Sequence, residues 1–354
     1  MPSVAPATIP RPSTGANAPA AIGGLDPALI AELCRRAGDA AGLERWRDQV
    51  RAAGYCQHPI RLQGGVDQVD QTTGEARTVL DSEALPDRVL LKACSTRRAA
   101  RCAPCAEVYR ADAYQLLRAG LAGGKGVPET ISQHPRLFVT FTAPSFGPVH
   151  SSRTRRGRVQ LCRPARPQAR CPHGRPRRCP IRHLPGDPAL GTPICAGCYD
   201  HQRTVLWNTL APELWRRTTI YLRRAIARAA GLTVTEADRL VRPAFAKVAE
   251  YQARGAVHLH AIIRLDATPP AHDPGRLAPP PAPFTIDLLA AAVRQAAHDV
   301  AVPCPAGGPP LGWGDQLDLR PIAGPAGGEL PAGRVAGYVA KYVCDDPGGG
   351  RGGI

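Results

Sequence analysis

The sequence has no run of about 20 consecutive apolar residues, the length that a membrane-spanning helix needs. Its first residues also lack the basic segment and apolar run of a secretion signal, so we expect a protein of the reducing cytoplasm with no membrane partner. Lysine is scarce, with four among 45 basic residues, and 29 acidic residues leave a formal net charge of +16. A positive charge of this size attracts polyanions, and it favours nucleic acid over a membrane surface as the partner.

Composition divides the chain into distinct parts. The first 24 residues are mostly Pro, Ala, Ser and Gly, and such a segment cannot offset its ordering entropy. The expected parts are a disordered tail (1–24), a helical region with a first cysteine cluster (25–130), an α+β domain (131–346) and a flexible tail (347–354). The domain is interrupted by an arginine-rich, zinc-binding insertion at 150–200 and by a Pro-rich linker at 267–283.

The pattern of apolar residues predicts both helices and strands. β-Branched and aromatic residues predict strands at 137–143 and 256–265, and a further strand at 316–322. Helical patterns cover 26–53, 106–122, 199–230 with an interruption at Pro212, 233–242, 284–300 and 333–343. Because no series of short βαβ units occurs, we expect an α+β fold whose antiparallel sheet has helices on one side.

His258 and His260 lie two residues apart in the strand predicted at 256–265. Side chains i and i+2 of a strand point to the same face, so both imidazoles project together while Leu259 faces the core. Two imidazoles in this arrangement can share one divalent cation. His-x-His also occurs by chance, and the metal interpretation rests on the strand context and on the turn at Arg254 that precedes it.

Tyr338 and Lys341 are three residues apart in the helix predicted at 333–343 and therefore share a face. A phenol with a pKa of about 10 is a poor nucleophile near neutral pH. A neighbouring ammonium group and a metal-polarised phosphate would each ease its attack. Taken alone, the segment fits a packed helix with a solvated lysine, and only its combination with the histidine pair favours catalysis.

Two Cys-x-x-Cys pairs, Cys102/Cys105 and Cys195/Cys198, have a spacing that lets two thiolates bind one tetrahedral zinc ion. The further ligands expected are Cys56 and Cys94 for the first pair, and Cys171 and Cys179 with His173 for the second, with Cys162 and His183 in reserve. Redox chemistry or chance is the alternative. We expect structural zinc at both pairs, since it would supply folding energy to an irregular segment.

Eleven arginines and no acidic residue lie between His150 and Gly186. A solvated loop is the simpler interpretation, but interleaved zinc ligands favour contact with DNA phosphates, which position a protein without reading sequence. The expected DNA-binding residues are Arg153, Arg155, Arg156 and Arg158.

Four segments taken in order resemble one known family: LFVTFTAPSFGPVH, CPHGRPRRCPIRHLPGDPALGTPICAGCYDHQ, YQARGAVHLHAIIRLD and VAGYVAKY. Their combination is similar to the replication initiators of actinobacterial rolling-circle and integrative plasmids, within the HUH endonuclease superfamily. The resemblance extends from about Gly54 to Tyr342, and it implies a central antiparallel sheet of about five strands flanked by helices.

The resemblance also implies a mechanism. His258 and His260 match metal ligands, with Gln252 or Glu250 as a third, and Tyr338 matches a nucleophile with Lys341 as its partner. Mg²⁺ or Mn²⁺ would polarise the scissile phosphate of single-stranded origin DNA. The tyrosine would form a 5′-phosphotyrosine and release a 3′-hydroxyl primer for a host helicase and polymerase. Tyr342, one helical turn away, is the alternative nucleophile.

Two departures from the family pattern affect these expectations. Arg334 stands where some relatives have a glutamate that activates water at termination, so that step is in question. Relatives usually continue with basic sequence, whereas this chain ends in VCDDPGGGRGGI, and we expect a truncated or frame-shifted C-terminus that could impair the enzyme. The main alternative is a non-catalytic, zinc-dependent DNA-binding regulator. A conjugative relaxase or an HUH transposase ranks lower because of the histidine count and spacing.

Overall fold

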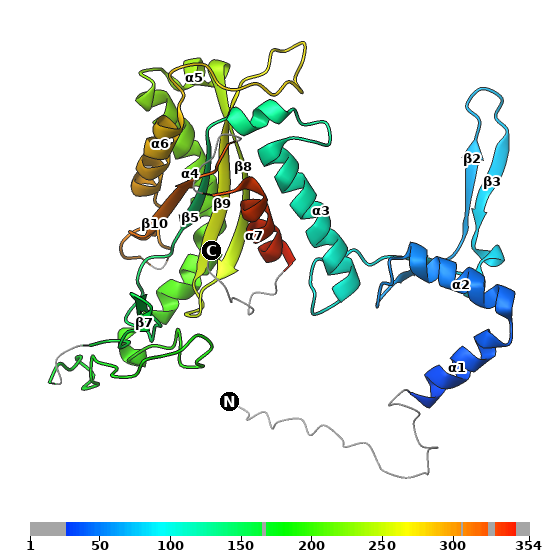
Figure 1. The fold of residues 1–354 in the computed structure, drawn as a ribbon, viewed down its shortest axis with the longest axis horizontal. Helices are drawn as coiled ribbons and strands as arrows, with labels where there is room; N and C mark the ends of the chain where they lie inside the picture. The colour runs from blue at the N-terminus through cyan, green and yellow to red at the C-terminus, as the bar shows by residue number, and fades with distance from the viewer. Residues whose placement is uncertain (1–25, 165–167, 306, 325–329, 345–354) are drawn as a thin grey trace, which may run out of the picture. The chain divides into compact units, whose positions relative to one another are not determined.

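The computed structural model describes residues 26–164, 168–305, 307–324 and 330–344, which form two compact units that divide between Cys94 and Ser95 (Figure 1). The tails expected at 1–24 and 347–354 lie outside the described residues. The units divide between Cys94 and Ser95 rather than near residue 130, because α3 (Ala103–Ala122) packs along α7 (Ala332–Cys344) within the second unit.

The first unit combines two helices with two small sheets. The single helix expected over 26–53 is divided into α1 (Pro27–Ala37) and α2 (Ala40–Ala52). The Asp39 side chain accepts a hydrogen bond from the backbone N–H of Gly42, which makes Asp39 a new N-cap and explains the division. The strands pair as β1 (Ile60–Leu62) with β4 (Leu90–Lys92) and β2 (Gly65–Val69) with β3 (Ala76–Asp81), and the 3₁₀ helices are η2 (Ser82–Ala84) and η3 (Pro86–Arg88).

The second unit is built on an antiparallel sheet of four strands, not the five expected. Its order is β10 (Leu317–Pro321), β5 (Arg136–Phe141), β9 (Val257–Ala267) and β8 (Val241–Tyr251). The sequence analysis missed β8, because its Ala, Lys, Glu and Pro residues are depleted in strands and pairing with β9 decides its conformation. The preceding helix α5 (Val234–Leu240) ends where β8 begins.

Helices cover both faces of this sheet, which corrects the expectation of helices on one side (Figure 1). On one face, Val139, Leu259 and Ile263 form a core with α4 (His201–Ala229) and α6 (Ile286–Asp299). On the other face, Phe138 and Ile262 pack against α7 and α3. Each of the strands β5 and β9 therefore contributes alternate residues to two separate cores.

The helix α4 continues through Pro212, where an interruption was expected. Trp207, Leu214 and Trp215 on both sides of the proline are buried, and this burial offsets the hydrogen bond that proline removes. In contrast, the segment before α4 has little regular structure, namely β6 (Thr154–Arg155), β7 (Arg158–Val159) and the 3₁₀ helix η5 (Ala196–Cys198). A further 3₁₀ helix, η4 (Glu129–Gln133), precedes β5. Within the described ranges, no helix has the length and apolarity needed to cross a membrane.

Candidate active site and metal-binding groups

The β8–β9 hairpin brings one carboxylate and two imidazoles together. Its register places Glu250 opposite His258. The Oε2 atom of Glu250 lies 2.9 Å from Nε2 of His258 and 2.8 Å from Nε2 of His260. The strand periodicity thus aligned the two histidines as expected, and one oxygen and two nitrogens converge on a volume suited to a divalent cation.

Gln252, the third ligand favoured by the sequence analysis, is not part of this group. It follows the last residue of β8, and its side-chain oxygen accepts a hydrogen bond of 2.8 Å from Nε of Arg254. Glu250, the alternative, lies within β8 opposite His258, and its carboxylate reaches both histidines. The turn at Arg254 therefore holds Gln252, while the sheet register selects Glu250.

The electrostatics of the group favour its metal-binding form. Burial raises the pKa of Glu250, but hydrogen bonds to His258 and His260 outweigh this effect and lower it to about 2. Burial lowers the pKa of His260, so its neutral form is favoured. The Nδ1 atom of His260 lies 3.0 Å from the Thr140 hydroxyl, an outer partner that can hold the proton on Nδ1 and leave Nε2 free to bind a cation. The donor set and its protonation states therefore fit a divalent cation.

Tyr338, on α7, faces the same group. Its hydroxyl oxygen lies 3.2 Å from Nε2 of His260. The Phe138 ring stacks on His260 and meets Tyr338 edge to face, so it fixes both rings. Burial, the hydrogen bond to Tyr342 and the nearby charge of Glu250 raise the pKa of Tyr338 above its usual value, so the phenol is protonated at neutral pH.

Tyr342 and Lys341 lie on the same helix near this group. The Tyr342 ring stacks on His260 at 5.7 Å and is buried. The Nζ atom of Lys341 lies 5.1 Å from the centre of the Tyr342 ring, which is a cation–π distance. The α7 helix therefore brings Tyr338, Lys341 and Tyr342 into one neighbourhood, and the hydroxyl of Tyr338 contacts the candidate ligand His260.

A cavity of about 550 Å³ adjoins the site along β8 and the end of α7. The cations Arg97, Arg98 and Lys247 line it, together with the exposed rings of Tyr109 and Tyr251. The buried Tyr342 contributes to its wall. Sequence analysis missed this cavity, because its residues come from three separate segments and only the Arg97-Arg98 pair gave a local signal.

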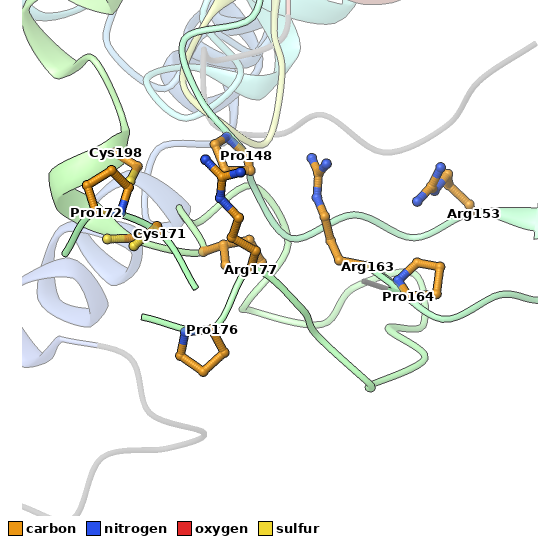
Figure 2. Close-up of a pocket in the computed structure, with 11 residues that line it drawn as sticks. Pro148, Arg153, Arg163, Pro164, Cys171, Pro172, Pro176, Arg177 and Cys198 are labelled. Atoms are coloured by element: carbon orange, nitrogen blue, oxygen red, sulfur yellow. The ribbon is translucent and has the colours of Figure 1, made fainter. Parts of the chain in front are cut away.

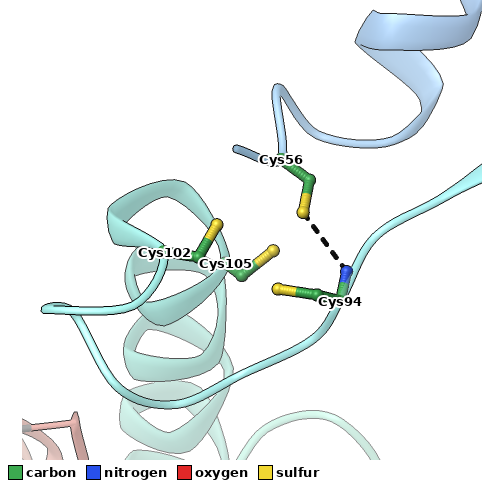
Figure 3. Close-up of side chains that lie close together, drawn as sticks. All are labelled: Cys56, Cys94, Cys102 and Cys105. Atoms are coloured by element: carbon green, nitrogen blue, oxygen red, sulfur yellow. Dashed lines mark hydrogen bonds between the residues drawn. The ribbon is translucent and has the colours of Figure 1, made fainter. Parts of the chain in front are cut away.

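The four residues expected in the first cysteine cluster are divided between the two units. Cys56 and Cys94 belong to the first unit, and Cys102 and Cys105 belong to the second (Figure 3). In the first unit, the backbone N–H of Cys94 donates a hydrogen bond of 3.3 Å to Sγ of Cys56. In the second, Cys102 caps α3 and Cys105 lies in its first turn, both buried. The assignment of these four residues to one zinc ion stays a prediction.

The insertion before α4 contains two groups of possible metal ligands, each with its ligand atoms within 4.8 Å of one another. One group is His150, Cys162, Cys179 and His183, and the other is Cys171, His173, Cys195 and Cys198. Cys179 was expected beside Cys171, Cys195 and Cys198, and the structure assigns it to the other group. The cause is strand-like pairing of Cys179 with Arg163, which brings Cys179 next to Cys162.

The thiols of the second group differ in acidity: burial and hydrogen bonds with Cys171 and Cys195 raise the pKa of Cys198 to about 11, whereas that of Cys171 is lowered. Burial raises the pKa of the Cys171 thiol, but backbone N–H groups of His173 and Arg175 outweigh this and lower it to about 6. The thiolate is the form of cysteine that binds metal.

The predicted DNA-binding arginines lie on the exposed surface of the insertion. Arg155 and Arg158 form the short β6–β7 hairpin, with Arg156 in its turn. Arg153 lines a cavity of about 660 Å³ together with Arg163 and other residues of the insertion (Figure 2). Its guanidinium donates a hydrogen bond to the backbone carbonyl of Cys162, so a member of one candidate metal-ligand group positions it.

Comparison with known proteins matches residues 42–347 to a family described as "Replication initiator protein, pSAM2". This match covers well over half of the chain. The chain belongs to this family of replication initiators. A curated "Replication initiator protein" of Streptomyces ambofaciens is 42% identical over 328 residues, which cover 90% of this chain and 66% of the relative. No solved structure matched the chain.

Membership in the family confirms the predicted resemblance to plasmid replication initiators. The family match spans the β8–β9 hairpin and α7, because it runs from residue 42 to residue 347. The chain covers just under two thirds of the curated relative's length, so the catalytic activity, substrates and partners of a whole initiator are treated below as proposals.

Proposed function

We propose that this replication initiator is an HUH-type endonuclease that nicks plasmid origin DNA through Tyr338. The observation that supports this most directly is the contact between the Tyr338 hydroxyl and a ligand of the Glu250–His258–His260 group, a distance of 3.2 Å. A nucleophile and a metal-binding group must both reach one phosphate, and this contact satisfies that requirement.

The chain's residues have separate roles in the proposed reaction. Glu250, His258 and His260 would hold Mg²⁺ or Mn²⁺, which would supply Lewis-acid polarisation of the scissile phosphate. The phenol oxygen of Tyr338 would attack the phosphorus and lose its proton to solvent, while the bond from phosphorus to the 3′-oxygen breaks and that oxygen takes up a proton from solvent. The products are a 5′-phosphotyrosine and a free 3′-hydroxyl. Lys341 provides positive charge on the same helix.

The cavity beside the site suits the single strand that leads to the scissile phosphate. Arg97, Arg98 and Lys247 provide charges for phosphates, while Tyr109 and Tyr251 offer exposed rings on which bases can stack. Proteins that bind single strands without strong sequence preference combine these two features. The arginines of the insertion would contact origin DNA away from the scissile phosphate. A host helicase would unwind the duplex, and a host polymerase would extend the 3′-hydroxyl.

A covalent-adduct assay tests the proposal. The full chain is incubated with single-stranded origin DNA and Mn²⁺, and the protein–DNA adduct is measured by denaturing electrophoresis. We expect the adduct to disappear in Tyr338→Phe and to persist in the matched variant Tyr342→Phe. Loss of the adduct in Tyr342→Phe alone would identify Tyr342 as the nucleophile. Absence of any adduct in the wild type would contradict the proposed endonuclease activity.

The second candidate function is a DNA-binding regulator without catalysis. The exposed arginines beside the cysteine and histidine groups of the insertion support it, since they would suffice for binding. It predicts salt-sensitive origin binding and no adduct, and His258→Ala with His260→Ala would leave every activity of the protein unchanged. The endonuclease instead predicts that this double variant binds DNA but does not cleave it.

A further inference from the structure

We propose that residues 150–198 form a module with two interleaved zinc sites, in which each metal closes a loop that contains ligands of the other. The first site is His150, Cys162, Cys179 and His183, and the second is Cys171, His173, Cys195 and Cys198. This inference concerns how the insertion folds and is independent of the proposed nicking reaction.

The order of the ligands along the chain defines the interleaving. The ligands occur as four consecutive pairs, and the first and third pairs form one site while the second and fourth form the other. The metal that joins Cys162 to Cys179 encloses Cys171 and His173 in its loop. The metal that joins His173 to Cys195 encloses Cys179 and His183. Neither loop can open without disturbing the other site.

Backbone hydrogen bonds support the same pairing independently of the ligand side chains. The N–H of Arg163 donates to the carbonyl of Cys179, and the N–H of Cys179 donates back, both at 3.0 Å. The N–H of Cys162 donates to the carbonyl of Ile181 at 2.9 Å. These bonds hold the first and third ligand pairs side by side across the intervening 16 positions between Cys162 and Cys179.

The ligand atoms of both sites lie within a few tenths of an ångström of the separations that tetrahedral zinc requires. Zinc–sulfur and zinc–nitrogen bond lengths predict separations of about 3.3–3.8 Å between ligands. The Nδ1 atom of His150 lies 3.0 Å from Nε2 of His183 and 3.9 Å from Sγ of Cys162. Sγ of Cys179 lies 3.4 Å from Nε2 of His183. In the second site, Nδ1 of His173 lies 3.2 Å from Sγ of Cys198.

Two further features match metal ligation. The Nδ1 atom of His183 lies 2.6 Å from a carboxylate oxygen of Asp187, and ligating histidines commonly have such an outer carboxylate that orients the ring. In the second site, a Cβ atom added to Gly197 would lie 2.9 Å from ring atoms of His173. The glycine within Cys195-Ala-Gly-Cys198 therefore leaves the room that the histidine occupies.

The insertion has no apolar core among its described residues between 150 and 198. The buried side chains there are those of Cys162, Cys171, Cys179, Cys195 and His183, all of which belong to the two groups. Isoleucine and leucine residues such as Ile181 and Leu184 are exposed. Because apolar burial cannot offset the ordering entropy, metal binding is the available source of folding free energy.

Cadmium NMR of the cadmium-substituted full chain tests the pairing directly, because each cadmium resonance correlates with the β protons of the cysteines that bind it. We expect one resonance to correlate with Cys162 and Cys179, and another with Cys171, Cys195 and Cys198. A resonance that joins Cys162 or Cys179 to any member of the second set would overturn the proposal, as would the absence of metal bound to these five cysteines.

Zinc content gives a second, independent measurement. We expect Cys162→Ser to lower the zinc content by at least one ion per chain, and Cys304→Ser, a cysteine outside every group, to leave it unchanged. Equal zinc content in wild type and Cys162→Ser would overturn the first site. Neither measurement depends on DNA cleavage, so failure of the module and failure of the nicking mechanism are distinguishable.

Discussion

The hydroxyl oxygen of Tyr338 lies 3.2 Å from Nε2 of His260, although the two residues are 78 positions apart in the chain. The contact exists because α7 packs against the face of the sheet from which His260 projects, with the Phe138 ring packed beside both residues. A phosphate that approached the histidine group would thus meet the phenol.

Glu250 and Gln252 should differ sharply in their effect on metal binding. We expect Glu250→Gln to weaken Mn²⁺ binding at least about tenfold, because the substitution removes the anionic oxygen shared by the two histidines. The matched variant Gln252→Ala should bind Mn²⁺ as the wild type does. Isothermal titration of each variant measures the two affinities, and a larger loss in Gln252→Ala would contradict the assignment of Glu250.

The pH dependence of metal binding follows from the two shifted groups. The pKa of Glu250 is lowered to about 2 and that of His260 is lowered below 6.5, so both groups are in the metal-binding state at neutral pH. Protons therefore compete with the metal at His260 only as the pH falls below about 6.5. We expect nearly constant Mn²⁺ affinity from about pH 7 to 8. A steady decrease in affinity as the pH falls across that interval would contradict these shifts.

Phe138 should matter for both stability and catalysis. Its buried ring contacts His260 and Tyr338, and Phe138→Ala should lower the free energy of unfolding by about 3–5 kcal/mol. At a temperature where the variant is still folded, we expect slower adduct formation because both rings lose their support. Val139→Ala, on the opposite face of β5, is the control. It should be destabilised while its adduct formation stays near that of the wild type.

The arginines of the β6–β7 hairpin should contribute to DNA binding through charge alone. We expect the combined substitution of Arg155, Arg156 and Arg158 by alanine to weaken binding to all DNA sequences similarly. Each lost phosphate contact should reduce the slope of log affinity against log salt by about 0.7–0.9. The control is Arg216→Ala, which removes an exposed arginine that is ion-paired with Glu213 on α4. An unchanged salt slope in the triple variant would exclude phosphate contacts by the hairpin.

The parts of the site that were predictable from the sequence have local signals. Strand periodicity aligned His258 with His260, and helical spacing put Tyr338 and Lys341 on one helix. The identity of the third candidate ligand depends on the register of β8, a strand whose Lys247 and Glu250 give no strand signal. The sequence therefore leaves Gln252 and Glu250 as alternatives for that ligand. Register across a hairpin is a pairing property, and the spacing of residues within one segment does not determine it.

The candidate metal ligands of the insertion illustrate the same limit over longer distances. The Cys-x-x-Cys spacing identified Cys195 and Cys198, but Cys179 was expected in their group and belongs with Cys162. Backbone pairing between Arg163 and Cys179 decides this, and nothing in the spacing of the cysteines encodes it. The family resemblance implies about five strands, whereas the described sheet has four. The alternate apolar residues of β5 and β9 belong to two cores, and helices therefore cover both faces of the sheet rather than one.

The central claim is that Tyr338 is the nucleophile that attacks DNA at the Glu250–His258–His260 group. Its most direct test is mass spectrometry of the protein after reaction with single-stranded origin DNA and Mn²⁺, followed by nuclease and protease digestion. The account predicts a nucleotide joined to Tyr338 and its absence when His258 and His260 are both alanine. A nucleotide found on Tyr342 or on another residue, or DNA cleavage with no modified tyrosine, would contradict it.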